Sequence, residues 1–196
     1  EDNLASYVIV TQIVISSLTT IIFYKIITNF FPQKIAIIGA ILFCLFPLIV
    51  YSSSQISSGT IYLFLLLTFI LLILNLVNNN SKYLFKNFIL IGVLSGILIL
   101  TRRDFILIYF FTLFYSFIYF KFSFKKIIFI FLVTTITISP YIARNYIVFD
   151  KIIVHSGFGY NLWKAYNMNA GVEGFYIESV SLKNKIEKVK KDNFYR

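Results

Sequence analysis

Six long apolar stretches are the feature that most limits how this chain can fold. An α-helix of roughly 20 apolar residues crosses the hydrocarbon core of a bilayer, and about 17 to 25 residues is the workable range. The stretches are longer than strands and lack the polar–apolar alternation of membrane β-barrels. We therefore predict an all-α, polytopic transmembrane bundle of about six spans of this length. The spans are approximately residues 4–24, 35–51, 60–77, 84–100, 105–120 and 127–143.

Composition supports a membrane protein and argues against a nucleic-acid-binding protein. Hydrophobic residues make up 59% of the chain and charged residues 13%, which is far from the composition of a soluble domain. The net charge is +10, but the basic residues are dispersed among the connections, where anionic lipid headgroups explain them more simply. A single cysteine, Cys44, provides neither a disulfide framework nor a thiolate metal site. We expect membrane lipids, and no nucleic acid, as partners.

The lysines of the short connections predict the orientation of the bundle. They fall in every second connection, without acidic neighbours: Lys25 and Lys34, then Lys82 and Lys86, then Lys121, Lys125 and Lys126. The positive-inside rule places these connections in the cytoplasm. The connection at residues 51–60, the turn at 101–104 and the tail after residue 143 then face outward. We predict a transmembrane region at residues 1–143, followed by an extracytoplasmic loop and amphipathic segment at 144–196.

Three arginines lie on the predicted outer face, where basic residues of short loops are normally avoided. Arg102 and Arg103 separate two apolar stretches, and Arg144 ends the last one. A guanidinium group binds phosphate oxygens in a bidentate manner, so these residues are candidates for an anion site. Ordinary explanations remain open: arginines extend from helix ends to the interface, Asp104 can neutralise Arg103, and an arginine beside interfacial aromatic residues is common.

An aromatic, glycine-rich segment follows on the same face. Tyr160, Asn161, Trp163 and Asn167 offer the aromatic faces and amide groups that bind sugars, although a loop lying against the membrane explains them equally well. His155 has no partner at metal-ligand spacing, so we predict no metal site there.

Two features within the spans predict local structure. Gly92 and Gly96 have the spacing that lets a second helix approach closely. Pro47 is expected to kink its span, because proline removes a backbone donor.

The order of several motifs is similar to that in one family. Residues 92–96 (Gly-Val-Leu-Ser-Gly) lead into Leu100-Thr101-Arg102, and residues 140–146 (Pro-Tyr-Ile-Ala-Arg-Asn-Tyr) precede residues 159–162 (Gly-Tyr-Asn-Leu). With these motifs the chain resembles the polyprenol-phosphate-dependent glycosyltransferases of the GT-C fold. It is most similar to bacterial relatives of protein O-mannosyltransferases and of the aminoarabinose transferase that modifies lipid A, glycosyltransferase family 39. The likeness covers residues 29–174.

The resemblance implies transfer of a sugar from a polyprenyl-phosphate donor to a lipid or protein acceptor, on the outer face of a bacterial inner membrane. The reaction would invert the configuration at the anomeric carbon of the sugar, use an acidic general base and usually need a divalent metal. No other cofactor is identifiable. Arg102 matches the family's basic position after the threonine and would bind the lipid phosphate. Arg144 matches the arginine after the Pro-aromatic pair, and its role would be similar or structural.

The chain departs from the family pattern at three places. The family's catalytic carboxylate lies in an outer loop that would precede Glu1, so we expect a fragment that is inactive alone. Relatives often have a glutamate where this chain has Ser57-Ser58-Gly59, and a proline where it has Arg103.

Two other functions stay open: a transporter or flippase component, and a noncatalytic membrane subunit. Broken helices at matching positions in two halves of the chain would favour a transporter, and the sequence shows no such symmetry.

Overall fold

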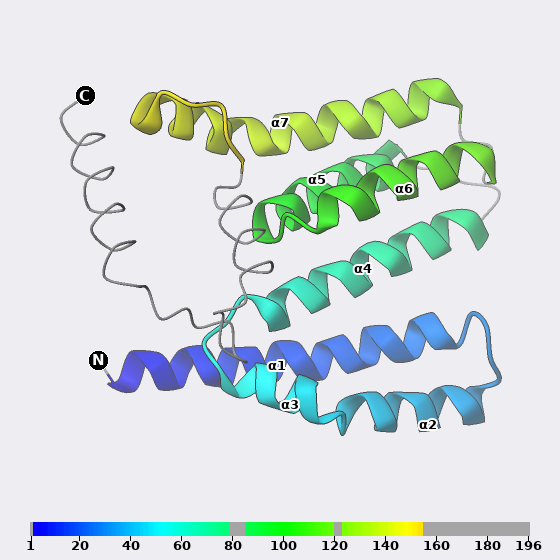
Figure 1. Cartoon of the computed structure of the whole chain (residues 1–196). Helices are drawn as coiled ribbons and strands as arrows, with labels where there is room; N and C mark the ends of the chain where they lie inside the picture. The colour runs from blue at the N-terminus through cyan, green and yellow to red at the C-terminus, as the bar shows by residue number, and fades with distance from the viewer. Residues whose placement is uncertain (1, 79–84, 120–122, 155–196) are drawn as a thin grey trace, which may run out of the picture. The chain divides into compact units, whose positions relative to one another are not determined.

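The computed structural model describes residues 2–78, 85–119 and 123–154, which form α-helices and no strand (Figure 1). These residues belong to one compact unit, residues 1–154. The helices are α1 (Asp2–Ile27), α2 (Gln33–Cys44), α3 (Pro47–Ser54), α4 (Gly59–Asn78), α5 (Phe85–Thr101), α6 (Phe105–Ile118) and α7 (Phe124–Phe149). The all-α prediction is confirmed.

The helix ends gather at two ends of the bundle. The ends that carry Lys25, Lys34, Lys86 and Lys125 lie together, at the right of Figure 1. The connection between α3 and α4 and the turn between α5 and α6 lie at the opposite end. We call the first the lysine end and the second, which carries Arg102 and Arg103, the arginine end. The alternation along the sequence of connections with lysine and connections without it therefore corresponds to two ends of one bundle.

The number of full-length spans is smaller than the six predicted. Among the described residues, α1 from Ala5, α4 and α7 are each long and apolar enough to cross a membrane, and α2 with α3 make a fourth span if the pair is counted as one. Helices α5 and α6 have 17 and 14 residues. At 1.5 Å per residue they are about 25 and 21 Å long, short of a hydrocarbon core of roughly 30 Å. Six full spans are therefore not confirmed.

The two prolines within apolar segments act differently. The predicted kink at Pro47 is confirmed, because α2 and α3 meet at 49° and Phe46 is extended, as a residue before proline prefers. By contrast, α7 continues through Pro140 to Phe149, past the end predicted at residue 143. Pro140 cannot donate to the carbonyl group of Ile136, and the Ser139 hydroxyl group donates to it instead, at 2.8 Å. This replacement supports an unbroken helix in lipid.

The glycines of α5 let this helix lie directly against α7. A Cβ atom at Gly92 would lie 2.7 Å from the Cβ atom of Val133, and one at Gly96 would lie 2.6 Å from the Cβ atom of Thr137. The hydroxyl group of Thr134 reaches the Gly92 carbonyl group at 3.2 Å. It also accepts a hydrogen bond from the Tyr109 hydroxyl group of α6, at 3.1 Å. The predicted close packing is confirmed, and it lies beside a core that α4, α5, α6 and α7 share.

Candidate anion-binding site

The turn between α5 and α6 is fixed by packing on both sides. The Arg102 amide group donates to the Leu98 carbonyl group at 2.9 Å, so the turn continues directly from α5. Phe105, the first residue of α6, is fully buried. Its ring meets the edge of Phe69 in α4, with 5.3 Å between the ring centroids. The two arginines of the turn are therefore presented from a rigid support.

Arg102 extends from this turn toward α4. Its guanidinium carbon lies 5.3 Å from the centroid of the Tyr62 ring, the geometry of a cation–π contact. The side chain is exposed, and no hydrogen bond joins its guanidinium group to another residue of the described part of the chain. Its planar set of donors has the geometry that binds an anion.

Arg102 and Tyr62 form part of the wall of a cavity of about 490 Å³ at the arginine end, which Leu48, Ile49 and Leu63 also line. We call it the polar cavity, because it is also lined by hydroxyl and amide groups. This volume is within the usual range for small-ligand sites, about 300 to 1,000 Å³. Hydroxyl and amide groups from four segments contribute to the wall: Ser16 and Thr19 of α1, Ser52 of α3, Gln55, Ser57 and Ser58 of the connection, and Thr60 of α4. Arg102 is the charged residue among the lining residues. The cavity therefore combines one positive charge with many neutral hydrogen-bonding groups.

Hydrogen bonds hold the connection between α3 and α4 in place. The Gln12 amide nitrogen of α1 donates to the Ser57 carbonyl group at 2.8 Å. The Thr60 hydroxyl group donates to the Ser52 carbonyl group at 3.1 Å. A Cβ atom at Gly59 would lie 3.0 Å from the Ser52 hydroxyl oxygen, so this close approach favours glycine. Residues 57–59, where the sequence analysis expected a departure from the family pattern, lie in the cavity wall as neutral hydroxyl groups and a glycine.

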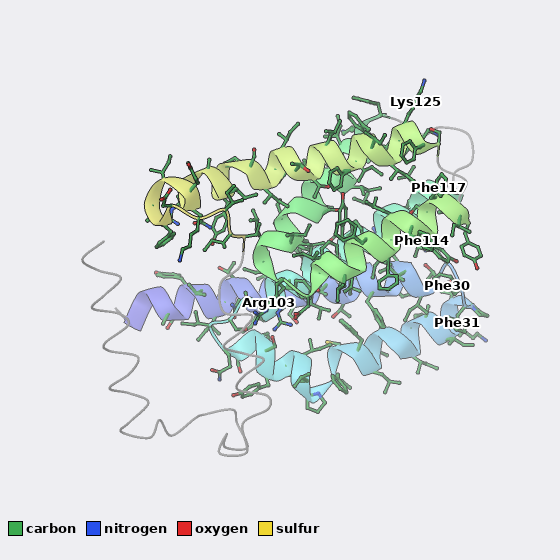
Figure 2. All side chains as sticks on the ribbon, turned by 45° about the horizontal axis from the view of Figure 1, so that its top comes forward. Phe30, Phe31, Arg103, Phe114, Phe117 and Lys125 are labelled. Carbon is green, nitrogen blue, oxygen red and sulfur yellow. The ribbon has the colours of Figure 1, made fainter. Side chains whose placement is uncertain are left out.

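The other two predicted arginines are placed differently. Arg103 is half-buried, and one of its terminal nitrogens is buried without a hydrogen-bond partner in the described residues, so Asp104 does not hold that nitrogen. In Figure 2 it lies far from Phe30, Phe31 and Lys125 of the lysine end. Arg144 is exposed and donates to the Asn145 side-chain oxygen at 3.3 Å. Of the three arginines, Arg102 is the one found among the residues that line the cavity.

The sequence analysis missed most of the cavity. Gln12, Ser16 and Thr19 recur at a helical spacing along α1, and Gln12 and Thr19 are 4% and 1% exposed. This polar stripe within an apolar span is a signal that the sequence contains. Tyr62 gives no comparable signal, because its role depends on the approach of α5.

A divalent metal does not fit the described residues. They contain no cluster of three or more His, Cys, Asp or Glu side chains, and no carboxylate group lines the cavity. Divalent magnesium and related ions prefer carboxylate oxygens. The residues described here therefore do not supply the metal site that the family resemblance implied. Six residues named in the sequence analysis lie outside the described residues: Glu1, His155, Tyr160, Asn161, Trp163 and Asn167.

The fold and the cavity together define an integral membrane protein of apolar helices with a hydrogen-bonding, positively charged site at one end. The family model for dolichyl-phosphate-mannose-protein mannosyltransferases matches residues 2–143, more than half of the chain. The chain belongs to this family of GT-C membrane glycosyltransferases, as its motifs predicted. The match includes Arg102 and the whole cavity wall. Neither a curated protein nor a solved structure gives a significant match.

Proposed function

We propose that the chain is the donor-binding part of a glycosyltransferase that transfers a sugar from a polyprenyl phosphate to a lipid or protein acceptor on the outer face of the membrane. The family membership implies the class of donor. The position of Arg102 in the wall of the polar cavity is the observation that carries the proposal. The lysine-bearing connections gather at the other end, which supports an outer position of the cavity by the positive-inside rule.

Arg102 suits the phosphate group of the donor. Its guanidinium group presents parallel N–H donors that match two phosphate oxygens, and the Tyr62 ring restricts its position. When the glycosidic bond to phosphate breaks, negative charge grows on the departing phosphate, and a fixed cation in a low-dielectric site stabilises that charge. The surrounding hydroxyl groups are suited to the sugar hydroxyl groups.

A noncatalytic, lipid-binding subunit is the second candidate. The observation in its favour is that the described residues of the cavity wall include no carboxylate group to act as a general base. Both candidates share the lipid-phosphate site. Sugar transfer by the full-length polypeptide, set against binding without transfer, distinguishes the two.

Substitution of Arg102 tests the phosphate site. We expect Arg102→Ala to weaken binding of a polyprenyl-phosphate sugar by at least about tenfold, because a lost charge-assisted hydrogen bond costs roughly 1.5–3 kcal/mol. Arg103→Ala, the matched control in the same turn, should stay within about threefold of the unmodified chain. Native mass spectrometry of the detergent-purified protein measures both. Equal affinities for the unmodified chain and the two variants would contradict the assignment.

Metal removal gives a separate expectation for this site. We expect the affinity for the lipid phosphate to change by less than about twofold when EDTA replaces Mg²⁺ or Mn²⁺, because Arg102 supplies the positive charge. The same titration, run with and without chelator, measures the effect. A tenfold loss of affinity with EDTA would show that a metal, held by residues other than those described, takes part in donor binding.

A further inference from the structure

One polar side chain inside the apolar helix α1 is almost completely buried. Gln12 is 4% exposed, whereas its neighbours Thr11 and Ile13 are exposed. The helix around it, from Ala5, is long and apolar enough to cross a membrane. A buried amide group in such a span costs free energy unless both its N–H and its carbonyl group have hydrogen-bond partners. The partners of Gln12 therefore indicate what its side chain does.

Only one half of this amide group is paired within the described residues. The Gln12 Nε2 atom donates to the Ser57 carbonyl group at 2.8 Å. That bond fixes the orientation of the amide, because a reversed amide would place its oxygen against the Ser57 carbonyl oxygen. The Oε1 atom is buried and accepts no hydrogen bond from the residues that the structure describes. A buried acceptor without a donor is unfavourable, so a bound donor would stabilise this oxygen.

The unpaired oxygen belongs to the polar face that borders the polar cavity. Ser57, to which Gln12 donates, lines that cavity. Ser16 and Thr19 line it as well, and they follow Gln12 at spacings of four and seven residues on one face of α1. Gln12 itself is not among the lining residues, so a ligand has to extend from the cavity toward α1 to reach Oε1.

The chemistry of Oε1 determines which group it can bind. An amide oxygen accepts hydrogen bonds and donates none, so it repels phosphate oxygens, which are also acceptors, and favours a hydroxyl donor. Arg102 has the opposite preference, because a guanidinium group only donates. The two residues come from different elements, α1 and the turn between α5 and α6. A ligand with a phosphate group and hydroxyl groups would satisfy both.

We infer that Gln12 is a specificity-determining residue, whose side-chain carbonyl oxygen accepts a hydrogen bond from one hydroxyl group of the sugar on the polyprenyl phosphate. The inference rests on the proposed function and adds a residue that selects the sugar. A sugar without that hydroxyl group would leave Oε1 buried and unpaired, and such mismatches discriminate strongly between substrates. A residue that only supported the wall through Ser57 would affect the binding of every sugar equally.

The test compares one sugar donor with analogues that each lack a single hydroxyl group. The parent ligand is polyprenyl phosphate mannose, after the description of the matching family. Gln12→Met removes the acceptor and the donor with little change in side-chain length. Thr11→Val is the matched control on the same helix, because Thr11 is exposed and its hydroxyl group donates to the Tyr7 carbonyl group of α1, at 2.8 Å. Native mass spectrometry of the detergent-purified chain measures binding.

We expect the unmodified chain and Thr11→Val to bind one of these analogues at least about tenfold more weakly than the parent. Gln12→Met should bind that analogue and the parent within about twofold of each other, because it has no acceptor to leave unpaired. A preference of about tenfold for the parent that persists in Gln12→Met would overturn the inference. The inference also fails if the unmodified chain binds every analogue as well as the parent.

Gln12→Glu separates recognition of the hydroxyl group from support of the cavity wall. This variant retains an acceptor oxygen but loses the N–H group that donates to Ser57. We expect it to keep the preference for the parent even where its affinity for all the ligands falls. Loss of the preference in Gln12→Glu would contradict the inference. Equal weakening of all the ligands by Gln12→Met would show that Gln12 only supports Ser57, and the inference would fail.

Arg102→Ala keeps this inference and the proposed function distinguishable. It should weaken binding of the parent and of every analogue by a similar factor, because all of them have the phosphate group. Weakened binding by Arg102→Ala, with the preference for the parent unchanged in Gln12→Met, would overturn the role of Gln12 alone. Equal binding by Arg102→Ala and the unmodified chain, or no binding of the parent by the unmodified chain, would overturn the proposed function.

Discussion

Replacement of Gly92 with leucine is expected to force α5 away from α7 and to lower the free energy of unfolding by about 3 kcal/mol, the upper end of the usual cost of overpacking. Even a single added carbon would lie 2.7 Å from two atoms of Val133 and 3.2 Å from the Ile130 carbonyl oxygen. These are the β-carbon and first branch of a stiff side chain and a backbone atom, so the neighbours cannot move aside. Separation of the helices would also break the hydrogen bond from Thr134 to the Gly92 carbonyl group.

Alanine variants provide a graded control for this prediction. Gly92→Ala and Gly96→Ala should both destabilise the protein, because a Cβ atom at either position would lie within 2.7 Å of a neighbouring Cβ atom. Gly39→Ala should be neutral or slightly stabilising: the added carbon would meet only the end of the Ile27 side chain, at 3.0 Å, and alanine favours a helix over glycine by about 1 kcal/mol. Denaturation with SDS, followed by circular dichroism, measures the three. Equal stability of all three variants would contradict the packing argument.

Replacement of Phe105 with alanine is expected to cost roughly 2 kcal/mol of stability. Phe→Ala in water-soluble cores costs about 3–5 kcal/mol, which includes transfer of the ring from water as well as the cavity left behind. In a bilayer the unfolded reference state already places the ring in lipid, so the loss of packing dominates. Phe105 is fully buried and contacts Phe69. Its removal would therefore leave a cavity and remove the contact between the two rings.

Phe111 provides the control for Phe105. It lies on the same helix but is 71% exposed, so Phe111→Ala should change the free energy of unfolding by less than about 0.5 kcal/mol, as most surface substitutions do. Phe105→Leu should restore most of the stability, because leucine refills part of the cavity. The SDS titration used for the glycine variants applies here. If Phe105→Ala and Phe111→Ala are equally stable, burial of Phe105 does not stabilise the bundle.

Features that depend on neighbouring residues in the chain were predictable. The apolar stretches predicted helices, Pro47 predicted the break between α2 and α3, and Gly92 and Gly96 predicted close packing; all three predictions are confirmed. The count of six spans was not confirmed, because apolar composition does not reveal where a helix ends. Helix α7 continues past residue 143, the end of the predicted span, and the Ser139 hydroxyl group replaces the donor that Pro140 lacks.

The candidate site was predictable only in part. Arg102 was recognisable because a basic residue in a short loop on the expected outer side is unusual, and its assignment to the lipid phosphate remains a prediction. The spacing of Gln12, Ser16 and Thr19 on α1 offered a further signal. The positions of Arg103 and Arg144 outside the cavity wall were not predictable, since their motifs give no direction for the side chains.

The sequence by itself determined that this protein is a helical membrane protein of its family, because hydropathy, helix spacing and motif order are properties of residues close together in the chain. Only the tertiary structure decided which side chains share a cavity with Arg102. Tyr62, Ser52 and Ser16 reach that cavity from three helices. These arrangements of side chains depend on the packing of helices far apart in the sequence, and that packing depends on the shapes of all the contacting surfaces together.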